Sequence, residues 1–388
     1  MTDVRPGPAP IAVYVHWPYC ARICPYCDFN VVRDRGRTEQ QAALVEAILA
    51  DLEAQAGRLG PRRLESVFFG GGTPSLMDPH AAARMVEAAH RLFPGGSDPE
   101  ITLEANPTDA EAARFRGFAE AGVQRLSLGV QSLSDEALRF LGRNHGAAEA
   151  RRAMEAALAA FPRLSIDLIY ALPGQTVADW SAELAEAVSL GAEHVSPYQL
   201  TIEPGTAFDR AVGRGVFTPA VGDLAADLYE AAQDVLGAAG FEAYEVSNHA
   251  RGGAARSRHN LAIWRGAEYV GVGPGAHGRM VLDGARTATR GARGIDDYIA
   301  RVGATGLGWD EVDPLDALAA AEERLLLGLR ILEGVPLADV AALGLGPEAP
   351  RATALVDMGM VEVEAGRIRA TARGRMVLDR VIAELVSA

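Results

Sequence analysis

The chain has few cysteines and no long apolar run, and each shortage excludes a class of protein. Its 388 residues contain only 3 cysteines, an odd and closely spaced set that fits a reducing compartment better than a disulfide framework. No apolar run approaches the length of a membrane-spanning helix, and the first ten residues, MTDVRPGPAP, lack the apolar core of an export signal. We therefore expect a cytoplasmic protein without an integral membrane segment.

Positive charge is also scarce. The chain carries 37 Lys and Arg against 51 Asp and Glu, a formal net charge of -14. Such a chain repels DNA and anionic membranes, so we expect no nucleic-acid partner. The apolar fraction of 49% supports a real core, and the length fits one large domain plus a smaller one.

All the cysteines lie in one short loop. Cys20, Cys24 and Cys27 form the pattern C-x3-C-x2-C directly after the apolar segment 11–15. Three clustered thiolates can hold three irons of a [4Fe–4S] cube and leave the fourth iron open to a small molecule. The alternative is structural zinc, with His16 as a fourth ligand. Structural zinc usually takes two separated pairs of ligands, and this chain offers no second pair, so the pattern favours an iron–sulfur cluster.

Short apolar strands alternate with amphipathic helical stretches up to about residue 204. The strand candidates are 11–17, 64–72, 100–107, 125–132, 164–174 and 194–204. Segments rich in Ala and Glu, such as 38–57 and 177–191, lie between them. Alternating βα units predict a parallel sheet with helices outside, and six units are too few for the usual eight-stranded barrel. The sequence therefore predicts an α/β fold with a partial (β/α)6 barrel.

Polar residues stand at or near the ends of these strands. The cysteine loop follows the first strand and GGGTP (70–74) follows the second; the others are Glu104, Gln131, Asp167 and Tyr198. The carboxyl ends of parallel strands carry the active site in βα architectures, so six elements converge on one mouth.

This mouth has the chemistry to hold a chelating amino acid. Glycines at 70–72 let main-chain groups approach a ligand closely, although a tight turn without a ligand would use them too. Glu104 can accept from an ammonium group, Arg143 can pair with a carboxylate, and Asp167 can accept from ribose hydroxyls. Taken singly, each is more often a member of a salt bridge.

The remainder of the chain is less regular. A helix is expected over 219–239 and a strand over 241–248, followed by a loop over 251–258. His259 then opens HNLAIW; imidazole is a usual axial ligand of haem iron, but a structural histidine is the alternative, as it is for His277.

The end of the chain predicts a small domain of its own. Residues 301–388 contain a Leu-rich helix (315–333), two short helices, a hairpin (360–371) and a last helix (373–386), the outline of a winged helix. In an acidic chain we interpret it as a packing or docking module. The expected division is 1–245 for the barrel, 246–300 for a connecting segment with the histidine motif, and 301–388 for the C-terminal domain.

Several motifs together resemble one superfamily. YVHWPYCARICPYCDF, FFGGGTPSL, LEANP, RLSLGVQS, DLIYALPGQT and HNLAIWRGAEYVGVGPGAHG look like radical S-adenosylmethionine (radical SAM) enzymes, in particular the oxygen-independent coproporphyrinogen III oxidase-like proteins. The resemblance runs in order from about residue 11 to the C-terminus. It implies a partial barrel of the radical SAM type followed by a small winged-helix-like α/β domain.

Two branches of this group differ in their sequences. True coproporphyrinogen dehydrogenases have a fourth cysteine two residues after the third, where this chain has Phe29, and they have a longer N-terminal extension. The CDF form and the HN-x-x-x-W segment are similar to the haem chaperone branch. The resemblance thus implies a protein that binds haem and hands it to haem-requiring proteins, without coproporphyrinogen oxidase activity. The alternative is a radical SAM enzyme that oxidatively decarboxylates coproporphyrinogen III.

The resemblance also implies site residues. Cys20, Cys24 and Cys27 would ligate the [4Fe–4S] cluster, and His259 would bind haem. The residues that match the family's S-adenosylmethionine contacts are Tyr14, Tyr26, Gly71, Gly72, Thr73, Glu104, Gln131, Arg143 and Asp167. One departure is Ile263, where the haem motif usually has Tyr. The expected partners are haem as cargo and haem-acceptor proteins, with respiratory enzymes as candidate acceptors and a homodimer as a candidate assembly.

Overall fold

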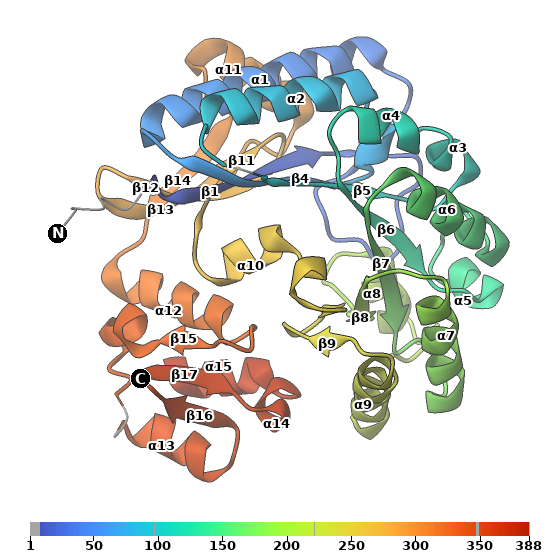
Figure 1. The fold of residues 1–388 in the computed structure, drawn as a ribbon, viewed down its shortest axis with the longest axis vertical. Helices are drawn as coiled ribbons and strands as arrows, with labels where there is room; N and C mark the ends of the chain where they lie inside the picture. Colours follow the sequence, from blue (N-terminus) through green and yellow to red (C-terminus); the bar gives the residue numbers. More distant parts are fainter. Residues whose placement is uncertain (1–7, 97, 221, 347–348, 388) are drawn as a thin grey trace.

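The computed structural model describes residues 8–96, 98–220, 222–346 and 349–387. Residues 1–7, on which the expectation about an export signal mainly rests, lie outside the described residues. The chain forms a strongly curved sheet with helices along its outer side, followed by a small C-terminal domain (Figure 1). Among the described helices, none combines the length and the apolar character needed to cross a membrane.

The first part of the sheet is the predicted partial barrel. Its six parallel strands are neighbours in chain order. They are β1 (Pro10–Trp17), β4 (Arg63–Gly71), β5 (Glu100–Ala105), β6 (Arg125–Gln131), β7 (Arg163–Tyr170) and β8 (His194–Gln199). The connecting helices are α1 (Thr38–Leu59), α2 (Pro79–Leu92), α3 (Asp109–Ala112), α4 (Phe115–Glu120), α5 (Asp135–Phe140), α6 (Ala147–Ala160) and α7 (Val177–Ser189). The prediction of a (β/α)6 partial barrel is confirmed.

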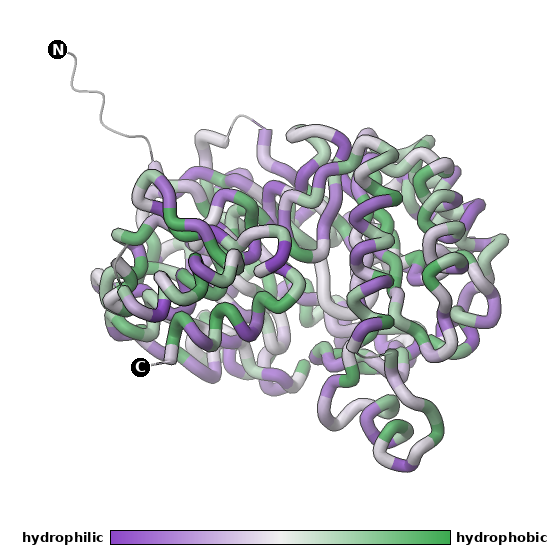
Figure 2. Tube along the Cα trace, turned by 90° about the horizontal axis from the view of Figure 1, so that it is seen from below, coloured by the Kyte–Doolittle hydropathy of each residue, from purple (hydrophilic) through white to green (hydrophobic). Residues whose placement is uncertain are grey.

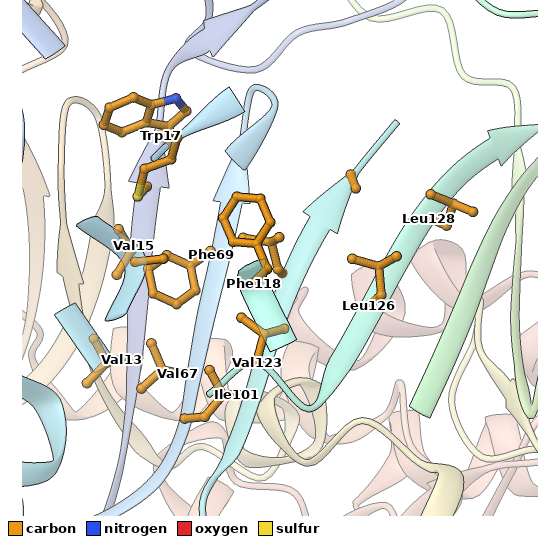
Figure 3. Close-up of a cluster of buried hydrophobic side chains, with 14 of the residues drawn as sticks. Val13, Val15, Trp17, Val67, Phe69, Ile101, Phe118, Val123, Leu126 and Leu128 are labelled. Atoms are coloured by element: carbon orange, nitrogen blue, oxygen red, sulfur yellow. The ribbon is translucent and has the colours of Figure 1, made fainter. Parts of the chain in front are cut away.

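The two faces of these strands differ because side chains alternate along a strand. The outer face is apolar: Val13, Val67, Ile101 and Leu126 are fully buried, and Phe118 of α4 packs over them (Figure 3). Burying each such side chain contributes roughly 1.5–3 kcal/mol. Hydrophilic and hydrophobic residues are interspersed along the helices seen in Figure 2.

The inner face of the barrel is polar instead. Ser165 of β7 lies opposite His194 of β8, and the Ser165 hydroxyl is 2.7 Å from His194 Nδ1. Glu100 is fully buried and forms a 2.6 Å ion pair with Arg163. Buried polar groups need hydrogen-bond or charge partners, and these side chains find them in one another.

Further strands extend the sheet on both sides. β11 (Glu268–Val272) is parallel to β1, and the antiparallel strands β12 (His277–Leu282), β13 (Ala285–Gly291) and β14 (Trp309–Pro314) follow it, with α11 (Ile295–Thr305) between the last two. At the other edge, α8 (Ala207–Gly213) and α9 (Asp223–Ala238) precede the short strands β9 (Glu242–Ala243) and β10 (His249–Ala250). The prediction of one strand over 241–248 is confirmed only for Glu242–Ala243, because Glu245 lies outside the sheet and bridges to Ile331.

The C-terminal domain has its own core. Leu325, Val335, Val361, Ile368 and Leu385 are among its buried residues. Its elements are α12 (Ala317–Gly328), β15 (Val335–Pro336), a 3-10 helix (Leu337–Leu343), α13 (Pro350–Asp357), β16 (Val361–Glu364), β17 (Arg367–Ala370), α14 (Ala372–Arg375) and α15 (Leu378–Val386). The predicted winged-helix-like outline is confirmed, with β15 adding a third strand to the predicted hairpin. The exact division at 245 and 300 stays a prediction.

One helix links the two parts. α10 (Arg258–Trp264) begins after Ser257, whose hydroxyl caps it by accepting from the Asn260 N–H. It lies on the concave side of the sheet, between the barrel and the C-terminal domain (Figure 1). Arg324 of α12 donates to the Trp264 carbonyl oxygen at 3.3 Å, which ties the domain to this helix.

Candidate functional site

The cysteine loop borders a cavity at the mouth of the barrel. Cys20 ends the short strand β2 (Tyr19–Cys20), which pairs with β3 (Val32–Arg33), and the chain between them carries Cys24 and Cys27. All three thiols are free, and all three line a cavity of about 550 Å³. Burial raises the pKa of Cys20 to about 11 and also raises the pKa of Cys27. A bound metal lowers the pKa of its cysteine ligands by stabilising the thiolate. Cys20 and Cys27 therefore favour the neutral thiol without a cluster and would ionise when they bind one.

The zinc alternative needs His16, which has other partners. His16 Nδ1 lies 3.0 Å from the Tyr14 hydroxyl, and His16 Nε2 lies 2.9 Å from the Asn30 carbonyl oxygen. The carbonyl can only accept, so Nε2 carries the proton and Nδ1 accepts from Tyr14. The imidazole also lines a neighbouring cavity and not the one that the three cysteines border. This arrangement argues against His16 as a fourth metal ligand.

The glycine segment closes one side of the cysteine cavity. Gly71 has φ +107°, in the left-handed region that favours glycine, and its N–H donates to Glu104 Oε2 at 3.2 Å. A Cβ on Gly72 would lie 2.7 Å from the Tyr19 carbonyl oxygen, so the main chains of both segments meet there. Thr73 is buried and accepts from Asn106 Nδ2 at 3.0 Å. Gly71 and Gly72 therefore shape the cavity wall through the backbone, and Thr73 contributes its hydroxyl.

Glu104 has an unusual charge state. It reaches both cavities from β5. Burial raises the pKa of Glu104 to about 8, and the nearby Asp167 carboxylate adds to the rise. Burial likewise raises the pKa of Asp167, which accepts from the Ser127 hydroxyl at 3.0 Å. A cation bound between these two carboxyls would favour their ionised forms, so the pair can receive a cationic, hydroxyl-bearing ligand.

The raised pKa predicts a pH-dependent stability. Between about pH 4.5 and 8, folded Glu104 holds a proton that the unfolded chain has released, so the free energy of unfolding falls as the pH rises through this window. Glu104→Gln should remove this decrease and make the ligand-free protein more stable than wild type above pH 8, by up to a few kcal/mol at about 1.4 kcal/mol per pKa unit. Thermal unfolding across the pH range measures it. Asp28→Asn, which removes an exposed carboxylate from the same rim, is the matched control; parallel profiles for Glu104→Gln and wild type would contradict the assignment.

Arg143 brings positive charge to the thiols. Its Nη1 donates to Cys24 Sγ at 3.2 Å and to the Tyr26 hydroxyl at 3.3 Å, and its Nη2 donates to Asn106 Oδ1 and to the Gly129 carbonyl oxygen. Its buried Nε has no hydrogen-bond partner among the described residues. Buried polar atoms are rarely left unpaired, so the Nε of this arginine keeps a hydrogen-bonding capacity that no described residue uses.

Most of the predicted site residues meet in this one cavity. The residues that line it are Cys20, Cys24, Tyr26, Cys27, Gly71, Gly72, Thr73, Glu104, Gln131, Arg143, Asp167 and Tyr198. Sequence reasoning missed Asn106, Ser127 and Gly129, which also line it. The sequence held a weak indication of two of them. Asn106 directly follows the third barrel strand, and Ser127 is a polar residue between apolar residues of the fourth.

Two predicted residues lie elsewhere. Tyr14 lines the neighbouring cavity of about 450 Å³, which it shares with His16 and His277. His259 is 3% exposed and lines neither cavity. Its Nδ1 is 2.9 Å from the Ser66 hydroxyl, its ring stacks on Phe68, and burial lowers its pKa to about 4. The structure therefore keeps His259 neutral and packed against the inner face of the barrel.

Comparisons with known proteins agree with this geometry. A Radical SAM superfamily model matches residues 14–187, and a HemN C-terminal domain model matches residues 315–377. The mitochondrial "Radical S-adenosyl methionine domain-containing protein 1" of Bos taurus is 40% identical over 394 residues, covering 98% of this chain and 88% of that protein. "Heme chaperone HemW" of Mycobacterium tuberculosis is 35% identical over 380 residues, covering 97% of this chain and 95% of that protein.

A solved structure shows the same fold. Coproporphyrinogen III oxidase (HemN) from Escherichia coli, described as a radical SAM enzyme, superposes with a TM-score of 0.79 over 99% of this chain and 92% of that chain. The two sequences are only 20% identical, so this likeness concerns the fold alone. The similarity to proteins of higher identity is what settles the family: the chain belongs to the radical SAM superfamily and, within it, to the family of the heme chaperone HemW.

Proposed function

We propose that this chain is a haem chaperone, which binds haem and delivers it to haem-requiring proteins, respiratory enzymes among them. The observation that carries the proposal is the 35% identity to "Heme chaperone HemW" over nearly the whole of both chains. Phe29, at the position where the sequence comparison expects a fourth cysteine in coproporphyrinogen dehydrogenases, supports a chaperone over that enzyme. Three free, clustered thiols also fit the reducing cytoplasm as its location.

Membership of the radical SAM superfamily implies a [4Fe–4S] cluster and S-adenosylmethionine, and the cysteine cavity fits both. Its three free thiols supply the cluster ligands, and about 550 Å³ lies in front of them. When bound, the cluster supplies an electron that can cleave a C–S bond of S-adenosylmethionine. We assign Cys20, Cys24 and Cys27 to the cluster.

The remaining side chains of the cavity have distinct tasks in this assignment. Arg143, beside Cys24, balances the negative charge of a bound cluster and pairs with a ligand carboxylate. Glu104 accepts from an ammonium group, and such a cation lowers its pKa from about 8 and so releases a proton. Asp167 accepts from ribose hydroxyls, and Gly71 and Gly72 let the ligand approach the main chain. Thr73, Gln131 and Tyr26 complete the wall.

A haem titration tests the proposal. The cluster-reconstituted protein is titrated anaerobically with haem, and we expect a saturable Soret band at about one haem per chain with micromolar or tighter affinity, about -8 kcal/mol of binding free energy. Absence of saturation with both the cluster-free and the reconstituted protein would refute the chaperone. In that case, multiple anaerobic turnovers of coproporphyrinogen III would establish the enzyme instead.

A further inference from the structure

Three arginines lie close together just after the cysteine loop. Arg33 belongs to β3, and Arg35 and Arg37 follow it before α1 begins. All three are exposed, and they line one cavity of about 290 Å³ to which no carboxylate of the described residues contributes. Other arginines of the chain are paired, such as Arg62 with Glu268 at 3.1 Å, but these three form no ion pair with a described residue. In a chain of net charge -14, they are a local excess of positive charge.

The backbone between these arginines is held in a defined turn. Asp34 Oδ1 accepts from the Gly36 N–H at 2.8 Å and from Gln41 Nε2 at 3.1 Å. Gly36 has φ +69°, in the left-handed region that favours glycine. The carboxylate of Asp34 thus fixes the turn and forms no ion pair with a described arginine. A partner of the arginines meets a preorganised loop, which lowers the cost of ordering on binding.

This turn is joined directly to the first cysteine. Strand pairing places Arg33 opposite Cys20, and the Asp34 N–H donates to the Cys20 carbonyl oxygen at 2.7 Å. Val32 is 40% exposed and lines the same cavity as the arginines, so it adds an apolar contact. We call Val32, Arg33, Arg35 and Arg37 the arginine face. A molecule bound to this face is separated from Cys20 only by the ribbon of β2 and β3.

An iron–sulfur cluster that gives up an electron has to be reduced again. The sequence has 3 cysteines and all of them are assigned to the cluster, so no thiol remains to act as a reductant. The electron therefore has to come from another molecule. In the balanced step, an external one-electron carrier is oxidised by one electron and the cluster is reduced by one, without any bond being made or broken.

We propose that the arginine face is the docking surface for a small acidic protein that carries single electrons to the cluster. This inference rests on the proposed function, because it supplies a partner to the cluster of that site. The guanidinium groups can pair with carboxylates around the redox centre of such a carrier, and complementary charge selects and orients a partner. Salt screens the acidic remainder of the chain, since the Debye length is about 8 Å at physiological ionic strength.

A small carrier fits this face better than an extended polyanion does. A membrane or a nucleic acid presents negative charge over a long surface, so it also meets the acidic parts of the chain around the face. A small protein contacts the arginines and Val32 and leaves the remainder of the surface free. The partner is therefore expected to have a compact acidic patch.

Binding is the first readout, on the cluster-loaded full chain. The probes are an acidic [2Fe–2S] ferredoxin and an acidic flavodoxin, titrated by calorimetry at several salt concentrations. Arg33→Gln with Arg35→Gln should weaken binding about tenfold at low salt and reduce the dependence on salt, because exposed ion pairs are weak singly and act together here. Arg33→Lys with Arg35→Lys keeps both charges and should retain most of the affinity.

The rate of cluster reduction is the second readout. Rapid-freeze electron paramagnetic resonance follows the electron from the reduced carrier to the cluster, and the Gln pair should lower the second-order rate constant about tenfold. Dithionite should reduce the cluster to the same extent in the Gln pair and in wild type, which shows that the cluster is intact. Arg116→Gln with Arg373→Gln, on α4 and α14, is the matched control, since both side chains are exposed and the net charge changes equally. It should behave as wild type does.

The outcomes separate this inference from the function. If the Gln pair binds the carriers and accepts electrons as wild type does, or if wild type binds neither carrier, the docking surface is refuted and the chaperone stands. Binding of phosphatidylglycerol vesicles that needs Arg33 and Arg35, without binding of either carrier, refutes it in favour of a lipid surface. A wild type that binds a carrier through these arginines but binds no haem keeps the docking surface and refutes the chaperone. A wild type without a cluster removes both the cluster assignment and this inference.

Discussion

Cys24→Ala is expected to leave the purified protein without its iron–sulfur cluster. The variant removes one of three thiols that line the same cavity, and no fourth cysteine exists in the chain to replace it. Two thiolates do not hold a cube that needs three protein ligands. The lost thiol is also the one that accepts from Arg143 at 3.2 Å, so the guanidinium keeps a charge that no cluster balances. Anaerobic reconstitution followed by iron and sulfide analysis and visible absorbance measures the effect, and we expect close to no bound iron.

Ile23→Ala is the matched control for this variant. Ile23 precedes Cys24 in the same loop and is 45% exposed, so its removal changes the loop without touching a ligand. It should bind a full cluster. A full complement of iron and sulfide in Cys24→Ala would show that Cys24 is not a ligand, whereas zinc and no iron in wild type would replace the iron–sulfur assignment altogether.

Gly71→Ala is expected to damage the cavity and the fold together. A Cβ on Gly71 would lie 2.6 Å from His16 Cε1, and φ +107° is a conformation that alanine rarely adopts. His16 cannot move aside easily, because the Tyr14 hydroxyl and the Asn30 carbonyl hold both sides of its ring. Backbone strain and overpacking each cost about 1–3 kcal/mol, so we expect a destabilisation of ~2–6 kcal/mol. Because Gly71 N–H also positions Glu104, S-adenosylmethionine binding should weaken by about a hundredfold, or ~2.7 kcal/mol.

Thermal unfolding and a titration of the reconstituted protein with S-adenosylmethionine measure the two effects. The control is Gly57→Ala in α1, where a Cβ meets nothing within 4 Å. Alanine favours a helix over glycine by about 1 kcal/mol, so this variant should be as stable as wild type or slightly more so. Unchanged melting and binding in Gly71→Ala would remove the glycine segment from the proposed site.

Local pattern was sufficient for the barrel strands. The segment 125–132 alternates apolar and polar residues, and β6 occupies Arg125–Gln131. The segment 11–17 is a nearly continuous apolar run, and it lies within β1. The local pattern was insufficient where tertiary contacts determine the backbone path. The segment 241–248 has the pattern of a strand, but only Glu242–Ala243 pairs in the sheet, and the buried Glu245 bridges to Ile331. A contact with a residue so distant in the chain leaves no trace in local periodicity.

The same division applies to the site. Strand ends of a parallel sheet share one edge, so the order of motifs was enough to bring Glu104, Gln131 and Asp167 to the cysteines. The order of motifs could not show that Tyr14 lines the neighbouring cavity and not the cysteine cavity. The reason is that the strands of one sheet edge border both cavities. Nor could it show Arg143 between Cys24 and Asn106, an arrangement that depends on how the segment between α5 and α6 folds back over the mouth.

The sequence by itself determined the class of this protein. Three features were enough for this: the spacing of three cysteines, the alternation of strands and helices, and the polar residues at the strand ends. All three are local or periodic, so they can be recognised without knowing which distant residues meet. Only the tertiary structure decided which histidine is accessible. His259 and His277 look alike in the sequence, yet one is 3% exposed against Ser66 and the other lies in an open cavity opposite Arg290. The physical reason is that accessibility and partners depend on neighbours far away in the chain, such as Ser66 for His259, which no local pattern encodes.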